Sequence, residues 1–194
     1  MKEKYAITIG RDFGSGGLEI AEKVAERLNI EYYNKDLVEL VSDLNGIDPS
    51  IVNAMDEKLP GLFASDEEEE ISLNIYENQA VVMQNVSNHG SAIFLGRCAD
   101  AQLQDNENVL SIFVTAPLDF RAKRIKEEFH FPTLEAAKKK INKVDRDRRR
   151  YYEHYSGRKW GDINMKDFII NSESMGIDGA VELIVSEVYR RWGK

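Results

Sequence analysis

The sequence predicts an α/β protein built on a parallel sheet with helices on both faces. Short apolar runs typical of buried strands alternate along the chain with segments whose apolar residues recur at helical spacing. In the first such unit, the run at residues 5–9 leads into a glycine-rich stretch, and the apolar residues from Leu18 to Leu28 then recur every three or four positions. Repeated alternation of strand and helix is typical of a parallel sheet.

The first half of the chain predicts three more helices and one more strand. Asp48 before Pro49 is typical of a helix start, because aspartate caps exposed N–H groups and proline is tolerated in the first turn. Ser65 and Glu68 have capping-box spacing, so the acidic run that follows is expected to open a long helix. In chain order, we expect a strand at 31–33, a helix at about 35–44, a short helix from 49 and a helix to about 88.

The second half alternates more clearly. We expect Thr133 and Asp178 to cap its last two helices, and Gly157 to end the first of these. In chain order, the expected elements are strands at 92–95 and 109–115, helices at 117–129 and 133–155, a strand at 167–171 and a helix at 178–191. Neither an internal repeat nor a low-complexity linker interrupts the chain, so we expect a single domain over residues 1–194.

Length and composition fit one globular domain. The chain has 194 residues, of which 42% are hydrophobic, enough to form a sizeable core. No apolar run approaches the length of a membrane helix, and the five-residue apolar stretch near the start is too short for a signal peptide. We therefore expect no association with membranes. Cys98 is the only cysteine, which excludes an intrachain disulfide and favours a cytoplasmic protein.

Charge is distributed unevenly along the chain. The formal net charge is −8, yet residues 121–160 carry 14 lysines and arginines against 6 aspartates and glutamates. An acidic protein with one basic segment is poorly suited to coat a nucleic-acid backbone, but it can focus its field on one small anion. Binding of nucleic acid through the arginines at 146–150 is therefore the weakest of the functional readings.

A glycine-rich segment occupies residues 10–17, between the first predicted strand and helix. Glycines there let consecutive N–H groups turn toward an anion, and the helix N-terminus adds partial positive charge. The segment departs from the pattern G-x-x-x-x-G-K-[ST], because Gly17 stands at the lysine position and Leu18 at the hydroxyl position. The residues alone therefore fit a tight structural turn as well as a phosphate site.

This segment and its continuation, ITIGRDFGSGG into LEIAEKVAERLNIEYYNKDL, resemble the start of the cytidylate kinase-like family. That family belongs to the P-loop nucleoside monophosphate kinases and likewise lacks the usual lysine. The resemblance continues in order through SAIFLGRCAD, FVTAPLDFRAKRI, KVDRDRRRYYEHYSGRKWGD and FIINSESMGIDGAVELI. It implies a three-layer P-loop kinase-like α/β/α fold with a central five-stranded parallel sheet, a helical acceptor-binding region over about 34–90 and a helical lid over about 130–163.

The resemblance also implies roles for individual residues. The glycine loop would hold the donor phosphates, Arg97 the acceptor monophosphate, and Asp100 the acceptor's sugar or base. Arg97 follows a predicted strand, where parallel sheets place their ligands, although a surface ion pair is an equal alternative. The implied donor-binding residues are Arg11, in place of the lysine, with Gly14, Ser15, Gly16 and Gly17. The implied acceptor-binding residues are Lys35, Asp36, Arg97, Asp100 and Arg121, of which Arg121 fits a structural role better.

The helix predicted over 133–155 contains an arginine on its apolar stripe. The stripe formed by Leu134, Ala137, Ile141 and Val144 continues to Arg148. An inward-facing arginine must be paired or must contact an anion, because burying it alone is costly. One interpretation is an ion pair with Asp145, three residues earlier. The resemblance instead implies catalytic roles in the lid for Arg148, Arg149 and Asp145, with the arginines close to the transferring phosphoryl group.

The leading hypothesis is a phosphotransferase that moves the γ-phosphoryl group of ATP, with Mg²⁺, to a nucleoside monophosphate such as CMP or to a related small acceptor. The oxygen ligands available to Mg²⁺ are few, with Ser15 and Asp12 as candidates, and no dedicated metal site is expected. The alternative is a catalytically inactive nucleotide-binding regulator. It is suggested by the missing lysine, by Leu18 in place of the family's arginine and by Asn34 in place of its aspartate. Either protein would be a monomer or a homodimer.

Overall fold

A five-stranded parallel sheet forms the centre of the computed structural model, which describes residues 4–34, 37, 40–42, 48–55, 57–61 and 64–193. The spatial order of the strands is β2-β3-β1-β4-β5, and each pair of neighbours is parallel. The strands are β1 (Ala6–Arg11), β2 (Glu31–Tyr33), β3 (Ala92–Leu95), β4 (Val109–Thr115) and β5 (Phe168–Asn171). The α/β class and the five-stranded sheet are thus confirmed.

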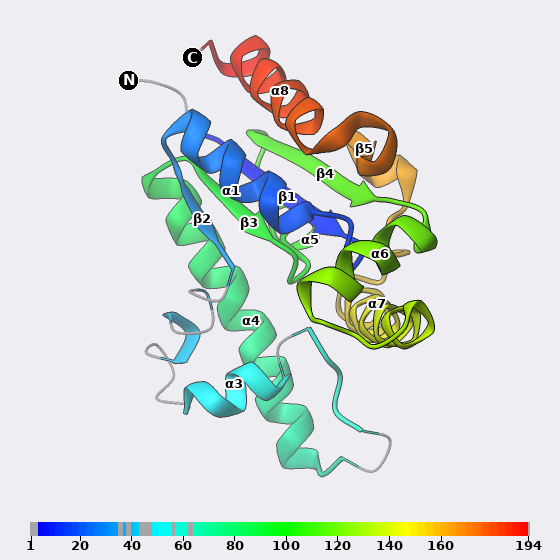
Figure 1. Cartoon of the computed structure of the whole chain (residues 1–194). Helices are drawn as coiled ribbons and strands as arrows, with labels where there is room; N and C mark the ends of the chain where they lie inside the picture. The colour runs from blue at the N-terminus through cyan, green and yellow to red at the C-terminus, as the bar shows by residue number, and fades with distance from the viewer. Residues whose placement is uncertain are drawn as a thin grey trace.

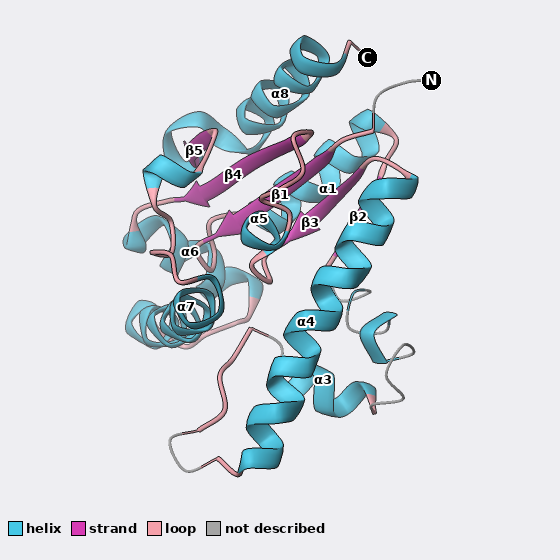
Figure 2. Ribbon diagram, turned by 180° about the vertical axis from the view of Figure 1, so that it is seen from behind, coloured by secondary structure: helices cyan, strands magenta, loops and turns pink. Residues whose placement is uncertain are grey.

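Helices cover both faces of the sheet (Figure 1). One face carries α1 and α8, and the view from behind shows α4 and α5 on the other, with α6 and α7 grouped at one end (Figure 2). The helices are α1 (Gly17–Leu28), α3 (Pro49–Met55), α4 (Asp66–His89), α5 (Ala99–Gln102), α6 (Leu118–Glu128), α7 (Leu134–Ser156) and α8 (Ser172–Trp192), with a 3₁₀ turn at Ile163–Met165. Most of the helix expected over 35–44 lies outside the described residues.

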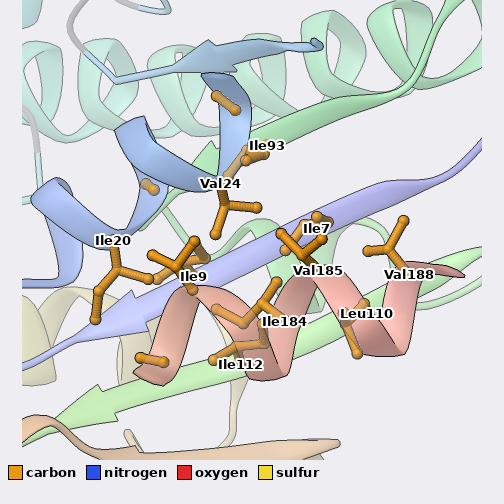
Figure 3. Packing of buried hydrophobic residues seen from close by; sticks show 14 of the residues in the cluster. Ile7, Ile9, Ile20, Val24, Ile93, Leu110, Ile112, Ile184, Val185 and Val188 are labelled. Atoms are coloured by element: carbon orange, nitrogen blue, oxygen red, sulfur yellow. The ribbon is translucent and has the colours of Figure 1, made fainter. Parts of the chain in front are cut away.

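The central strand β1 is buried on both sides, so its residues from Ala6 to Ile9 are all buried and do not alternate between buried and exposed positions. Apolar residues of α1 and α8 pack against one side of β1 and β4 (Figure 3). A second cluster, which includes Phe94 of β3 and Met83 of α4, fills the other side. The labelled residues of the first cluster are Ile7, Ile9, Ile20, Val24, Ile93, Leu110, Ile112, Ile184, Val185 and Val188.

Helix α8 differs from its predicted course. It begins at Ser172, where the Asn171 side chain accepts a hydrogen bond from the Glu173 N–H, and Gly176 then interrupts it with φ 73° and ψ 164°. The expected cap at Asp178 is wrong, because that carboxylate accepts a hydrogen bond from Lys23 of α1 instead. The short helix α5 was not expected, since four residues are too few to show helical periodicity.

The N-terminal caps of the two long helices are confirmed. At the start of α4, the Ser65 hydroxyl accepts from the Glu68 N–H and the Glu68 carboxylate accepts from the Ser65 N–H. At the start of α7, the Thr133 hydroxyl accepts from the Ala136 N–H, and Gly157 ends that helix in the left-handed region. Both helices therefore begin at residues that their side-chain chemistry specifies.

Replacing Ser65 by alanine is expected to lower the free energy of unfolding by about 1 kcal/mol, because an N–H group of the first turn of α4 loses its acceptor. Urea denaturation followed by circular dichroism measures the change. Ser186→Ala is the matched control, since that exposed hydroxyl bonds within α8 and caps no helix end. Equal stabilities of the two variants would show that the capping box contributes nothing measurable.

Candidate active site

The glycine loop follows β1 and turns directly into α1. Gly14 and Gly16 have φ near +80°, a conformation that L side chains rarely adopt. A Cβ atom at Gly16 would lie 2.4 Å from Cδ1 of Ile177, and one at Gly14 would lie 2.7 Å from Cγ1 of Ile125. The loop therefore needs glycine both for its turn and for close packing.

The same loop leaves the N-terminus of α1 open to a ligand. Gly16 is the N-cap residue and offers no side chain to the first-turn N–H groups. A cavity of about 610 Å³ lies in front of this helix end; we call it the donor cavity, and its walls include Gly14, Gly16, Gly17 and Arg11. Backbone N–H groups and the helix dipole favour an anion at this position.

Ser15 and Asp12 differ in what they offer to the donor cavity. Ser15 is fully buried, and its hydroxyl donates to the Asp12 carbonyl at 2.8 Å, so it is not presented as a ligand. Asp12 lines the cavity, and its Oδ2 accepts from Thr115 at 2.6 Å. Burial raises the pKa of the Asp12 carboxyl, partly opposed by this hydrogen bond. A carboxylate beside a phosphate-sized anion site fits Mg²⁺, which binds one or two carboxylates together with substrate phosphates.

Three arginines meet around one carboxylate beside the donor cavity. Arg11 ends β1, Arg97 follows β3, and Arg148 projects from α7; we call these three the arginine cluster. The Glu57 carboxylate accepts from Nη1 and Nη2 of Arg11 at 2.6 and 3.2 Å, from Nε of Arg148 at 3.0 Å and from the backbone N–H of Arg97 at 3.2 Å. The structure thus brings together three arginines that lie far apart in the sequence.

The arginine cluster is mostly buried. The side chains of Arg11, Glu57 and Arg148 are 9%, 14% and 16% exposed. Burial and repulsion from Arg148 lower the pKa of Arg11 to about 10, although Glu57 opposes this. Burial alone would raise the pKa of Glu57, but the charges of the three arginines outweigh it and hold that pKa well below its ordinary value. The Glu57 carboxylate thus accepts from two of the three guanidiniums, while the guanidinium of Arg97 donates to the Leu95 carbonyl.

Glycine at position 96 makes this arrangement sterically possible. Gly96 has φ 79°, and a Cβ atom there would lie 1.8 Å from Nη1 of Arg11 and 2.1 Å from Oε1 of Glu57. Sequence reasoning missed Glu57, because it lies between predicted elements and its partners are 40 to 91 residues away in the chain. The one indication in the sequence was Arg148 on the apolar stripe of α7, because a buried arginine needs an anionic partner.

Asp145 and Arg121 form a second buried pair beneath the glycine loop. Asp145 accepts from Nη1 of Arg121 and from the Phe13 N–H, both at 2.7 Å. Arg121 also donates to the Phe13 and Ala116 carbonyls. The proposed Asp145–Arg148 ion pair is therefore wrong. Both side chains bond to the backbone of Phe13 in the glycine loop, which fits a structural role for Arg121.

Beyond the arginine cluster, Asp100 and aromatic side chains surround a second, narrow cavity. Asp100 accepts from the Tyr152 hydroxyl at 2.7 Å and from Lys166, whose side chain is 2% exposed. Trp160 packs edge-on against Phe113 at 5.2 Å between ring centres. The free volume is about 20 Å³, room for about one water molecule. Its walls also include members of the arginine cluster, so the two cavities meet there.

The remaining predicted residues lie in different settings. Arg149 is exposed, and its guanidinium lies 5.5 Å from the centre of the Trp160 ring. Lys35 and Asp36 lie outside the described residues. Within the described ranges, no group of three or more histidines, cysteines, aspartates or glutamates could hold a metal ion. The helices in those ranges include none long and apolar enough to cross a membrane.

Comparisons with known proteins place the chain in a family and show which solved structures share its fold. The sequence profile of the cytidylate kinase-like family matches residues 6–174. A cytidylate kinase of Methanocaldococcus jannaschii is 25% identical over 186 residues, which cover 94% of this chain and 96% of that protein. An uncharacterized protein from Eubacterium ventriosum has a crystal structure with TM-score 0.75 and 28% identity, covering 97% and 100% of the two chains. A shikimate kinase from Acinetobacter baumannii in complex with shikimate shares the fold alone, with TM-score 0.53 and 14% identity over 98% and 96% of the chains.

Proposed function

The chain belongs to the cytidylate kinase-like family, and on this premise we propose that it transfers the γ-phosphoryl group of ATP to a nucleoside monophosphate, with CMP as the first candidate. The observation that carries the proposal is the convergence of Arg11, Arg97 and Arg148 where the donor cavity meets the narrow cavity. Phosphoryl transfer asks a protein mainly to position its reactants and to neutralise charge. The placement of these arginines beside both cavities supports the proposal.

The donor cavity supports binding of the ATP phosphates. The open N-terminus of α1 would bind phosphate oxygens through backbone N–H groups, and Arg11 would supply the positive charge that a lysine supplies elsewhere. Asp12 would hold Mg²⁺, which neutralises phosphate charge when bound. Ser15 would contribute only through its backbone, because its hydroxyl is buried and bonded within the loop.

The arginine cluster would act on the phosphoryl group in transit. The transferring group spreads negative charge over its three equatorial oxygens, and planar guanidinium donors match that geometry. Arg148 uses only its Nε in the bond to Glu57, and among the described residues none accepts from its two terminal nitrogens. These nitrogens are available to the transferring group, while Arg97 would hold the acceptor monophosphate. The acceptor nucleoside would lie toward Asp100 and Trp160.

A volume of about 20 Å³ cannot contain a nucleoside, so the narrow cavity must widen before an acceptor enters. Its walls include Tyr151 and Tyr152 of α7 together with Trp160, all within the segment expected to form a lid. We therefore propose that the region over about 130–163 moves away from the sheet to admit the acceptor. The region over about 34–90, which includes Glu57, would complete the acceptor side.

The second candidate is a nucleotide-binding regulator without turnover. It is favoured by Gly17 at the position of the missing lysine and by Glu57, which already occupies the arginine cluster. Such a protein would bind ATP in the donor cavity and would produce no ADP. Measurements of ligand binding and of turnover separate the two candidates.

Thermal unfolding with added ligands tests the proposed function. We expect Mg²⁺-ATP and one nucleoside monophosphate each to stabilise the protein, by about 2.7 kcal/mol at 100 times the dissociation constant. Cytidine, which lacks a phosphate, is the control for CMP and is expected to stabilise far less. An assay of ADP formation with the responding pair then measures turnover. Stabilisation by ATP without turnover would favour the regulator, and no response to any nucleotide at millimolar concentration would overturn the nucleotide site.

A further inference from the structure

Glu57 occupies the centre of the arginine cluster, and we propose that its carboxylate is an internal substitute for a substrate phosphoryl group, which displaces it on binding. This inference rests on the proposed use of the arginine cluster as a phosphate site. It assigns Glu57 a regulatory contact within that site: the carboxylate keeps the arginines paired while the site is empty and releases them when a phosphate arrives.

The contacts of Glu57 match those that a phosphate would take. Its two oxygens accept four N–H groups, two from the guanidinium of Arg11, one from Arg148 and one from the backbone of Arg97. Paired N–H donors of this kind bind carboxylate and phosphate oxygens alike. Because one N–H group cannot bond two anions fully, a phosphate that takes the N–H groups now bonded to Glu57 would displace the carboxylate.

The charge of the cluster explains why an internal anion is needed. Arg11 and Arg148 bond to the same carboxylate, and burial together with repulsion from Arg148 lowers the pKa of Arg11. Both side chains are largely buried, so solvent screens that repulsion poorly. Glu57 offsets part of the repulsion between Arg11 and Arg148. A phosphoryl group carries more negative charge than a carboxylate and therefore competes for the same donors.

The backbone at Glu57 allows the exchange. Glu57 lies just after α3, outside any helix or strand, and has φ 53°. A non-glycine residue rarely adopts this left-handed conformation, so it persists here only because surrounding contacts hold it. Release of the carboxylate would relieve this constraint without breaking the sheet or α4. Since Arg11 is on the sheet and Arg148 on α7, release would also uncouple the segment around Glu57 from both.

Binding of pyrophosphate tests the proposal directly, because it needs neither a nucleoside nor turnover. By isothermal titration calorimetry, Glu57→Gln is expected to bind pyrophosphate about tenfold more tightly than the wild type, since the competing carboxylate is gone. Glu187→Gln is the matched control: Glu187 also bonds two arginines, Arg190 and Arg191, but on α8. The Glu187→Gln substitution removes the same charge and is expected to change the affinity for pyrophosphate by less than about twofold.

A weaker or unchanged affinity of Glu57→Gln would overturn the proposal and make Glu57 a partner that only positions the arginines. An equal gain in Glu187→Gln would also overturn it, since any unpaired arginines would then suffice. A second measurement needs no variant: hydrogen exchange of the wild-type backbone over residues 57–61 is expected to accelerate when pyrophosphate binds. Unchanged or slower exchange there contradicts displacement.

Failure of this proposal can be distinguished from failure of the proposed function. Tighter binding by Glu57→Gln without nucleotide phosphorylation by the wild type would leave the internal-anion proposal standing and overturn the kinase. Phosphorylation of CMP by the wild type, with no gain of pyrophosphate affinity in Glu57→Gln, would support the kinase and overturn the internal-anion proposal.

Discussion

Replacing Arg148 by alanine is expected to lower kcat by about a thousandfold while changing the dissociation constant of Mg²⁺-ATP by less than about threefold. The two terminal nitrogens of Arg148 have no acceptor among the described residues, and Arg148 lines both cavities. Under the proposed function, their charge would be available to the phosphoryl group in transit, whose charge distribution differs from that of bound ATP. Steady-state kinetics with the responding monophosphate, together with calorimetric titration of ATP, measure both quantities.

Arg150→Ala is the matched control for this variant. Arg150 lies two residues further along α7, is exposed and lines neither of the two cavities. The Arg150→Ala substitution removes the same charge from the same helix. Because this charge is exposed and lies outside the two cavities, kcat is expected to stay within about twofold of the wild type. A similar loss of kcat in both variants would mean that α7 acts through its overall charge. A loss of ATP affinity as large as the loss of kcat would move Arg148 to ground-state binding.

Replacing Asp145 by asparagine is expected to lower the free energy of unfolding by about 3 kcal/mol. The change preserves the shape of the side chain, and the amide oxygen can still accept from the Phe13 N–H. It leaves Arg121, whose side chain is 11% exposed, without its counter-charge in a largely buried position. Urea denaturation followed by tryptophan fluorescence measures the loss.

The control for Asp145 is Asp147→Asn on the same helix. The Asp147 carboxylate lies 4.0 Å from Arg146, whose side chain is 65% exposed, and its removal is expected to cost less than about 0.5 kcal/mol. Together the two variants decide between a structural and a catalytic role for Asp145. Unchanged stability with a large fall in kcat would restore the catalytic role that the family resemblance implies.

The strands were the most predictable part of the fold. The ranges expected at 31–33, 92–95 and 109–115 agree with β2, β3 and β4 residue for residue. Parallel strands covered by helices on both faces become continuous apolar runs between polar loops, so the sequence itself marks their ends. The start of α8 was less predictable, because the short turn before Gly176 carries too few residues to show a period.

The arginine cluster was predictable only residue by residue. Arg97 follows a predicted strand and Arg148 lies on an apolar stripe, so local patterns marked these two, whereas only the family resemblance indicated Arg11. Helical spacing suggested Asp145 as the partner of Arg148, but spacing specifies only the face of a helix. The packing of α6 against α7 decided that Asp145 contacts Arg121 instead.

By itself, the sequence determined the alternation of strands and helices, the N-terminal caps of α4 and α7 and the glycine turn, because each depends on interactions within a few residues. Only the tertiary structure decided which charges meet. The parallel pairing of β1 with β3 brings Arg11 next to Gly96 and Arg97, and the chain then places Glu57 and Arg148 against them. Burial and charge act through space rather than along the chain, so the carboxylate at the centre of the site became visible only in the folded protein.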